Sequence, residues 1–251
     1  MSPGLIRLGR TAWTALADLL WPPICAVCPR ALPLAPTGAG WRAHFCPACL
    51  DTVEFLPAAL CPVCGRPFYN SATHLCIDCL ADPPPFRTAR ASAVYRGAVA
   101  SSIGRLKYNG DMTQVRVLAD LAAALPEPPA WDVLVPLPLS PRRLAARGFN
   151  QALVLARAAF PGRIPEPRLL SRPVEAELPQ AVLTRRQRQR AIRGSFLVPA
   201  PDQIRDARIL LFDDVVTTGA TAAEAARTLL AAGAREVHLA AVARTVLDSW
   251  R

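Results

Sequence analysis

The sequence is poor in lysine, aromatic side chains and long apolar runs. Lys107 is the single lysine among 29 lysine and arginine residues, and Phe, Trp and Tyr together make up 6% of the chain. No stretch approaches the roughly 20 consecutive apolar residues of a membrane-spanning helix, so we expect no stable membrane insertion. The shortage of aromatic rings argues against an extended platform on which the bases of a nucleic acid would stack.

Cysteine is also missing from most of the chain. All eight cysteines lie between Cys25 and Cys79, whereas a secreted protein cross-linked by disulfides would carry them throughout a small domain. We therefore expect reduced thiols and a cytoplasmic protein. Residues 1–24 have two arginines before an apolar run, but Asp18 interrupts that run and no convincing cleavage site follows. This pattern favours an amphipathic helix over a signal peptide.

Acidic residues are outnumbered by basic ones. With 19 acidic side chains against 29 basic ones, the net charge is +10, which favours anionic partners such as nucleic acid, phosphorylated substrates or a membrane surface. Every basic residue except Lys107 is arginine, and a genome that prefers arginine codons would produce the same excess. The charge alone does not decide between these explanations.

The cysteines form four CxxC pairs, a spacing that suits tetrahedral zinc. One CxxC turn places two thiolates on a metal ion, and two turns complete a closed site with no open position for catalysis. We therefore expect two structural zinc ions, without His44 or His74 as ligands. Sequential pairing closes the shorter loops, although the spacing is also compatible with an interleaved arrangement. The expected ligands are Cys25, Cys28, Cys46, Cys49, Cys61, Cys64, Cys76 and Cys79.

The proline-rich segment ADPPPF, at residues 81–86, marks a change in composition. We expect a helix over residues 1–24, a double zinc ribbon over 25–80, a linker over 81–88 and an α/β domain over 89–251. If these residues are a linker, a substitution that unfolds the ribbon should leave the domain that follows it largely intact.

Strand-like and helix-like segments alternate in the last of these regions. Such alternation indicates parallel strands joined by right-handed crossovers. Residues 139–148 are expected to form a loop, and the polar residues 161–206 to include a mobile loop. The expected strands are 91–97, 131–138, 208–214 and 235–245, and the expected helices are 99–110, 111–125, 150–160 and 222–234.

The strongest enzymatic signal is FDDVVTTGAT at residues 212–221. An apolar strand delivers Asp213 and Asp214 to the carboxyl edge of the sheet, where paired carboxylates suit the vicinal hydroxyls of a ribose or a hydrated Mg²⁺. In the turn that follows, backbone N–H groups, the positive end of a helix and threonine hydroxyls favour a phosphate. The expected phosphate-binding residues are Thr217, Thr218, Gly219, Ala220 and Thr221.

This string resembles the phosphoribosyl-pyrophosphate (PRPP) signature of type I phosphoribosyltransferases. With the cysteines, LKYNGD at 106–111, VPLPLSPRRLAARGFNQA at 135–152 and GSF at 194–196, it makes the chain similar to the ComF family of competence-related, amidophosphoribosyltransferase-like proteins. The resemblance implies a five-stranded parallel sheet flanked by helices, with a variable hood, and a PRPP site at residues 213–221. It also implies an association with DNA uptake, and hence with competence or DNA-processing proteins.

Several cations are candidates for contacts with the pyrophosphate of PRPP. Arg142, Arg143 and Arg147 follow a strand, and Arg147 is favoured because it begins the family-like string RGFNQ. Retention of lysine at Lys107 suggests a need for a compact ammonium, although an ordinary cation at a helix end explains it too. A further group of arginines lies later in the chain, and three roles are open to it. It closes over PRPP, it contacts nucleic acid, or it forms a solvated helix face. Its members are Arg185, Arg186, Arg188, Arg190 and Arg193.

Two classes of function compete. In the enzymatic hypothesis, PRPP binds with Mg²⁺ and its phosphoribosyl group is transferred, with Asp213 and Asp214 as the catalytic carboxylates. The protein would then mainly position the phosphates and stabilise the leaving charge. The rival is a non-catalytic protein that binds single-stranded DNA or senses PRPP. No residue in the sequence identifies the acceptor.

Overall fold

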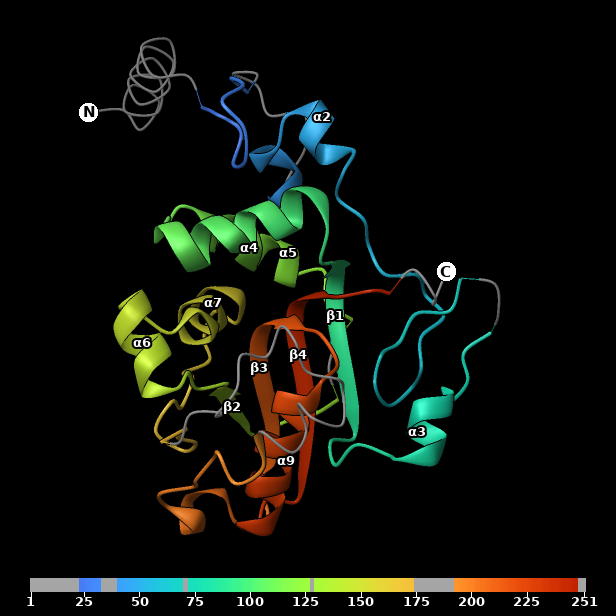
Figure 1. The fold of residues 1–251 in the computed structure, drawn as a ribbon, viewed down its shortest axis with the longest axis vertical. Helices are drawn as coiled ribbons and strands as arrows, with labels where there is room; N and C mark the ends of the chain where they lie inside the picture. Colours follow the sequence, from blue (N-terminus) through green and yellow to red (C-terminus); the bar gives the residue numbers. More distant parts are fainter. Residues whose placement is uncertain (1–22, 33–39, 70–71, 127–128, 174–191, 248–251) are drawn as a thin grey trace, which may run out of the picture.

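The computed structural model describes residues 23–32, 40–69, 72–126, 129–173 and 192–247 (Figure 1). The helix expected over residues 1–24, apart from its last two residues, lies outside them, as do Arg185, Arg186, Arg188 and Arg190. Within the described residues, no helix combines the length and the apolar character that crossing a membrane requires.

Four parallel strands form the centre of the molecule. They are β1 (Thr88–Val94), β2 (Val133–Pro136), β3 (Arg208–Val216) and β4 (Glu236–Arg244), arranged in the order β1–β4–β3–β2. β3 and β4 lie in the middle and are covered on both faces, which explains their nearly continuous apolar sequences. The family resemblance implied five strands, and the described residues contain four in this sheet.

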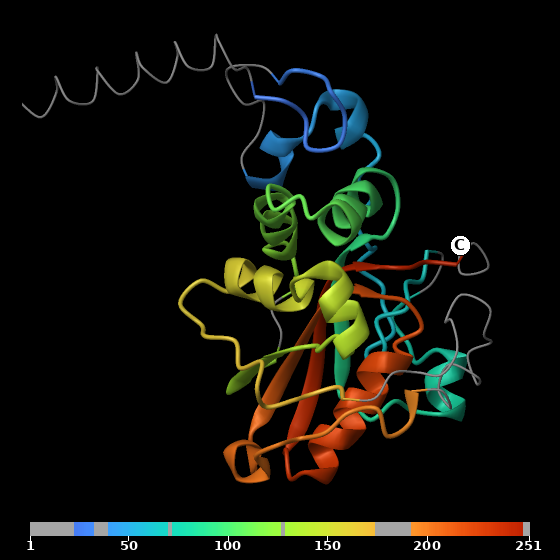
Figure 2. The ribbon, with the colours of Figure 1, turned by 60° about the vertical axis from the view of Figure 1, so that its left-hand side comes forward.

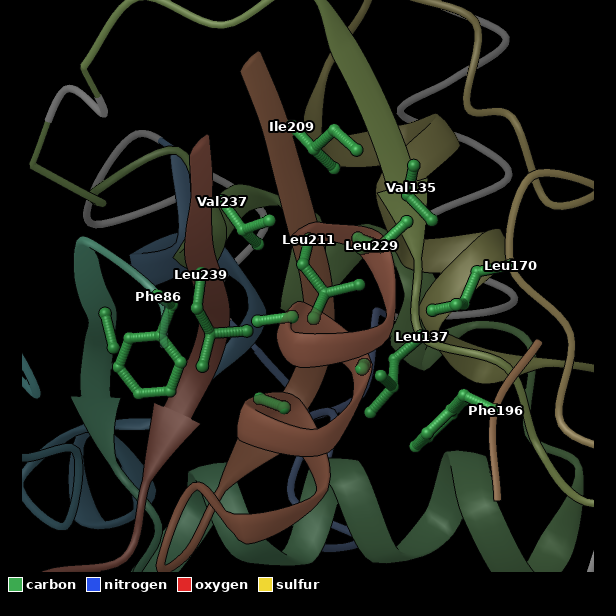
Figure 3. Packing of buried hydrophobic residues seen from close by; sticks show 14 of the residues in the cluster. Phe86, Val135, Leu137, Leu170, Phe196, Ile209, Leu211, Leu229, Val237 and Leu239 are labelled. Atoms are coloured by element: carbon green, nitrogen blue, oxygen red, sulfur yellow. The ribbon is translucent and has the colours of Figure 1, made fainter. Parts of the chain in front are cut away.

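Alternate residues of β3 divide the core into two layers. Leu210 and Phe212 belong to the layer under α4 (Gly97–Asn109), α5 (Gln114–Ala122) and α7 (Gln151–Ala159). Ile209 and Leu211 belong to the opposite layer, where they lie with Leu229 of α9 (Ala220–Ala231) and residues of β4 (Figure 3). The sheet therefore lies between helices on both faces, as the alternating sequence predicts.

Several boundaries differ from the sequence-based expectation, and two of the differences matter here. Residues 139–148 were expected as a loop, but Pro141–Arg147 form the helix α6. Ser140 stands at its N-cap position, Pro141 occupies its first turn, and Gly148 ends it with a φ of 80°. These are ordinary start and stop signals for a helix, so the expectation of a loop was wrong for a local reason. β1 also begins earlier than expected, at Thr88, the last residue of the expected linker.

The cysteine module consists of short elements. These are η1 (Gly40–His44), α2 (Pro47–Leu50) and α3 (Ile77–Ala81), and a further short turn, η2 (Pro201–Ile204), precedes β3. The part that contains α2 lies beside α4, whereas the part that contains α3 lies on the other side of β1 (Figures 1 and 2). The two halves of the module therefore contact different parts of the α/β domain.

The outer edge of β1 is covered by the module. Leu56 N–H donates to the carbonyl of Ser92 at 3.4 Å, and Val94 N–H donates to that of Glu54 at 2.8 Å. Further along, Ala89 N–H donates to the carbonyl of Val63 at 2.7 Å. These bonds lie directly across the boundary at which the sequence predicted a separating linker.

Candidate functional site

The eight cysteines gather into two clusters of four. The first cluster is Cys25, Cys28, Cys46 and Cys49, and the second cluster is Cys61, Cys64, Cys76 and Cys79. Within each cluster all sulfur atoms lie within 4.8 Å of one another. Four converging thiols with no other ligand fit a closed tetrahedral zinc site, and the sequential pairing favoured by the sequence is confirmed.

Backbone groups favour the thiolate form of one cysteine in each cluster. Burial by itself would raise the pKa of Cys25, but hydrogen bonds from backbone N–H groups, including that of Cys46 at 3.4 Å, lower it to about 7. In the second cluster, backbone N–H groups lower the pKa of Cys61 to about 7 in the same way against its burial, with Cys76 N–H at 3.5 Å. Since zinc binds thiolates, these bonds favour the metal-binding form of Cys25 and Cys61.

The two histidines near the cysteines have other partners. His44 Nε2 lies 2.8 Å from a carboxylate oxygen of Asp120 on α5. His74 is bonded through Nδ1 to the carbonyl of Ala72 and stacks on Phe68, with ring centroids 3.9 Å apart. Neither belongs to the metal-ligand clusters of the described residues, in agreement with the structural role expected for them.

β3 carries the two adjacent carboxylates to the carboxyl edge of the sheet. The chain then turns through Thr217 and Thr218, which are exposed, and enters α9 at Ala220. Gly219 has a φ of 77°, a left-handed conformation that glycine adopts without strain and that lets the turn reverse directly into the helix. We call residues 217–221 the phosphate loop, because its threonine hydroxyls and the start of α9 provide the features expected for binding a phosphate.

Asp214 is buried and held by residues from two other elements. Its side chain forms an ion pair with Lys107 at the end of α4, and Gln151 Nε2 at the start of α7 donates to it at 3.0 Å. Both partners belong to segments that the sequence singled out. The isolated lysine is therefore not a free helix-end cation, since its ammonium faces the paired carboxylates.

The charges in this group influence one another. Burial and the negative charge of Asp214 raise the pKa of Asp213 well above its usual value, and Lys107 counteracts part of this rise. For Lys107, burial lowers the pKa, but the charges of Asp214 and Asp213 outweigh it and the net effect is a rise. The lysine is therefore positive, while the carboxyl of Asp213 holds its proton more tightly than an ordinary aspartate does.

These residues line one cavity of about 600 Å³, which we call the anion cavity. Arg143 and Arg147 of α6 lie along it, and Arg147 also contacts Gln151 and the ring of Tyr108. Arg142, which was considered with them, is not among the residues that line the cavity. The lining residues used below are Lys107, Arg143, Arg147, Gln151, Arg172, Asp213, Asp214, Thr217 and Thr221.

Arg172 is the lining residue that the sequence analysis missed. It is only 7% exposed, and its guanidinium carbon lies 5.3 Å from the centre of the Phe196 ring. It follows the apolar pair Leu169 and Leu170, but no motif surrounds it and it was one of many arginines. Gln151 was quoted only as part of RGFNQ, and its contact with Asp214 gives that string a physical role.

Known proteins resemble the chain in both of its parts. A family model described as a double zinc ribbon domain matches residues 16–80. DNA utilization protein YhgH of Salmonella typhi is 30% identical over 237 residues, which cover 90% of this chain and 98% of the relative. YhgH of Escherichia coli (strain K12) is 31% identical with the same coverage. Competence protein ComFC of Bacillus subtilis (strain 168) is 29% identical over 77% of this chain and 84% of the relative.

The chain belongs to the ComF family. The similarity to full-length ComF relatives spans the cysteine module, the phosphate loop and the strands between them, so the resemblance inferred from the motifs is confirmed. In this ComF protein the two cysteine clusters and the parallel sheet form one connected structure, with the anion cavity at the carboxyl ends of β2 and β3.

Proposed function

We propose that this protein binds PRPP together with Mg²⁺ in the anion cavity and transfers the phosphoribosyl group of PRPP to an acceptor. One observation carries the proposal: the carboxylates of Asp213 and Asp214 share a single cavity with several cations and with Thr217 and Thr221, the first and last residues of the phosphate loop. The residues between them, Thr218, Gly219 and Ala220, line a neighbouring cavity. A phosphorylated ribose needs acceptors for its hydroxyls, donors for its phosphates and positive charge for its pyrophosphate. The cavity offers all three within one space.

The burial of the two carboxylates suggests a division of roles. Asp214 is 2% exposed and is engaged by Lys107 and Gln151, so it fixes the local charge and geometry. Asp213 is only partly buried and faces the cavity, so it is the carboxylate that contacts the ribose hydroxyls. The phosphate loop then takes the 5-phosphate, through its backbone N–H groups and the positive end of α9.

The arginines that line the cavity suit the pyrophosphate. Arg143, Arg147 and Arg172 present guanidinium groups, which bind phosphate oxygens in pairs. During transfer, negative charge grows on the leaving pyrophosphate, and cations already in place stabilise it without reorganisation. Bound Mg²⁺ would neutralise part of the phosphate charge, and the oxygen donors of Asp213 fit such an ion directly or through water.

The names of the relatives support a role in the handling of DNA. They are called DNA utilization and competence proteins, and we propose that this chain also acts in the uptake or use of DNA. A cytoplasmic site would keep the eight thiols reduced for zinc. Binding of single-stranded DNA and the sensing of PRPP without turnover remain the alternatives that an experiment must separate from transfer.

The decisive experiment is calorimetric titration of PRPP with and without Mg²⁺. Asp213→Asn, Asp214→Asn and Thr218→Val should each weaken binding about tenfold or more, because each removes a hydrogen bond to a charged or strongly polar group. Two matched controls should keep wild-type affinity: Asp202→Asn, at an exposed carboxylate, and Thr228→Val, inside α9 and away from the loop. Wild-type affinity in all three site variants would exclude the assignment. Release of pyrophosphate would then distinguish transfer from sensing.

The raised pKa of Asp213 gives the site a pH dependence. Affinity for PRPP and Mg²⁺ should increase as the pH rises through this pKa, because only the carboxylate binds the cation. Stability should change in the opposite direction. The folded protein holds the proton of Asp213 more tightly than the unfolded chain does. The free-energy cost of burying the ionised carboxylate is therefore absent below the ordinary aspartate pKa of 3.8, and it grows as the pH rises above that value. Asp213→Asn should therefore raise the melting temperature at pH 7, and should not raise it well below pH 3.8, where the carboxyl is protonated in both states.

A further inference from the structure

One arginine of the anion cavity is held by another side chain rather than by core packing. Arg147 is the last residue of α6, a helix of seven residues that buries none of them. Its guanidinium donates to the side-chain oxygen of Gln151, and its guanidinium carbon lies 6.0 Å from the centre of the Tyr108 ring. Because core packing does not fix α6, these two contacts decide where the charge of Arg147 lies.

Gln151 stands on a well-anchored part of the fold. It is the first residue of α7, it is 4% exposed, and α7 packs into the core through Leu155. The residue before it, Asn150, caps the helix by accepting from Ala152 N–H at 2.9 Å. The side-chain nitrogen of Asn150 also donates to the carbonyl of Leu137 at 3.1 Å. Gln151 is therefore fixed relative to the carboxyl end of β2, which precedes Leu137.

The two ends of the Gln151 amide face opposite charges. Its nitrogen donates to one carboxylate oxygen of Asp214 at 3.0 Å, and its oxygen accepts from Arg147. The other oxygen of Asp214 forms the ion pair with Lys107. A side-chain amide both donates and accepts, whereas an ionised glutamate only accepts and a lysine only donates. The two charged neighbours thus account for a glutamine at this position.

Gln151 also separates a cation from a carboxylate. Among the ion pairs of the described residues, Asp214 is paired with Lys107, and none joins Arg147 to a carboxylate. A guanidinium paired directly with Asp214 would lose much of its attraction for a phosphate, because the two charges would cancel. The neutral amide leaves the charge of Arg147 intact and uses one of the five N–H donors that a guanidinium has.

We propose that Gln151 is a positioning residue, whose amide holds the guanidinium of Arg147 at the wall of the anion cavity as an unneutralised cation for a pyrophosphate group. The identity of this anion rests on the proposed function. An arginine that is already in place binds a phosphate more tightly than a mobile one, because less side-chain freedom is lost on binding. The string RGFNQ then acts as a unit in which Arg147 supplies the charge and the following residues place it.

The test uses the two halves of PRPP, inorganic pyrophosphate and ribose 5-phosphate. Each is titrated calorimetrically with Mg²⁺ into the full-length, zinc-loaded protein. Gln151→Met keeps the approximate size of the side chain and removes both of its hydrogen bonds. It should weaken pyrophosphate binding about tenfold, the effect of one hydrogen bond to a charged group. The loss of ribose 5-phosphate affinity should be smaller, because Lys107 still holds Asp214.

Gln114→Met on α5 is the matched control. Gln114 is 1% exposed and also donates to an aspartate, Asp111, at 3.1 Å, but it does not line the anion cavity. Its replacement should lower the melting temperature and leave the affinity for both ligands unchanged. If this control loses as much pyrophosphate affinity as Gln151→Met, the effect is a general one on folding and the positioning role is wrong.

A double-mutant cycle separates positioning from a purely structural role. When Arg147→Met is already present, Gln151→Met should cause no further loss of pyrophosphate affinity, because no guanidinium is left to hold. Additive losses would overturn the proposal, and so would equal losses for the two ligands. Gln151→Asn guards against a failure of Gln151→Met to fold. It keeps the amide but is one methylene shorter, so that it should not reach both partners and should weaken pyrophosphate binding as well.

The outcomes distinguish this proposal from the proposed function. Wild-type pyrophosphate affinity in both Gln151→Met and Gln151→Asn would overturn the role of Gln151 while PRPP binding stands. Wild-type protein that binds pyrophosphate but not PRPP would overturn the proposed function alone. Wild-type protein that does not bind pyrophosphate at all would overturn the role assigned to Gln151, whatever the result with PRPP.

Discussion

The two zinc clusters have the same ligands but different surroundings. The first cluster packs against helices: Phe45 lies with Ala98 of α4 and Val117 of α5, and Gln114 donates to the carbonyl of Ala26 at 3.0 Å. The second cluster is bonded to β1 and to the end of β4, and it lines one cavity together with residues of the phosphate loop. Identical metal chemistry therefore supports two separate parts of the fold, and the second cluster also borders a cavity of about 490 Å³.

Close backbone contacts make the second half of the module part of the sheet. Gly65 has a φ of 71°, and a Cβ atom there would lie 2.3 Å from the carbonyl oxygen of Ala89. Arg90 donates to the carbonyl of Pro62 at 3.0 Å, and Arg244 donates to that of Cys64 at 2.7 Å. These bonds join residues that lie far apart in the sequence. The proline-rich segment therefore gave no sign of them when it was interpreted as a linker between module and domain.

The largest expected effect comes from removing one ligand from each cluster. Cys25→Ser and Cys61→Ser should each lower the zinc content from two ions to one per chain, since three thiolates do not complete a closed structural site. Cys61→Ser should also lower the thermal stability of the sheet and weaken PRPP binding, because its cluster supports β1 and borders the phosphate loop. Cys25→Ser should leave PRPP affinity largely intact. Metal analysis, hydrogen exchange of β1 amides and calorimetry measure these effects, and equal losses of PRPP affinity in the two variants would contradict the comparison.

A smaller effect is expected from the arginine that joins β4 to the second cluster. Arg244 is 5% exposed, and Arg244→Met should cost about 2 kcal/mol by removing a charged hydrogen bond inside the protein. Because β4 pairs with β3 as far as Val216, at the start of the phosphate loop, PRPP affinity should fall as well.

Arg90→Met is the matched control for Arg244→Met. Arg90 also donates to the ribbon, but it lines neither cavity, so its loss should lower stability while PRPP affinity stays unchanged. Denaturant unfolding and calorimetry give the two readouts. If Arg244→Met and Arg90→Met give the same result in both measurements, the second cluster supports the fold without positioning the phosphate loop.

The smallest effect concerns the first cluster. His44→Gln should cost about 0.5 kcal/mol, because the pair with Asp120 is partly exposed and such pairs contribute little. The zinc content should stay at two ions per chain, since His44 is not a ligand. Metal analysis together with thermal unfolding tests this, and loss of one zinc ion would show that the histidine takes part in the first site.

The motifs predicted the local features of this protein well. The spacing of the cysteines favoured the correct pairing, and the string around Asp213 identified the strand, turn and helix that follow each other there. The rarity of lysine drew attention to Lys107, whose ammonium indeed faces Asp214. In each case the signal lies within a short stretch of sequence, where residue type and spacing determine the geometry directly.

Contacts between distant segments could not be predicted in this way. Arg172 reaches the anion cavity because of the path of the chain after α7, and no neighbouring residue reveals it. The cavity of about 490 Å³ beside the second cluster combines that cluster, residues 83–86, part of the phosphate loop and the end of β4, which only the folded chain brings together. The error at residues 139–148 has another cause, because the sequence there does carry local signals for a helix. Ser140, Pro141 and Gly148 mark its start and end, and the expectation of a loop overlooked them.

The covered edge of β1 has a consequence for the behaviour of the protein in the cell. An exposed strand edge offers unpaired N–H and C=O groups to any other strand, and so promotes aggregation. Here Glu54 and Leu56 bond to that edge from the segment that joins the two clusters, and Val63 bonds to it from within the second. Zinc shortage would free this segment and expose β1 to other chains. We therefore expect chains that lack zinc to aggregate more readily than zinc-loaded chains.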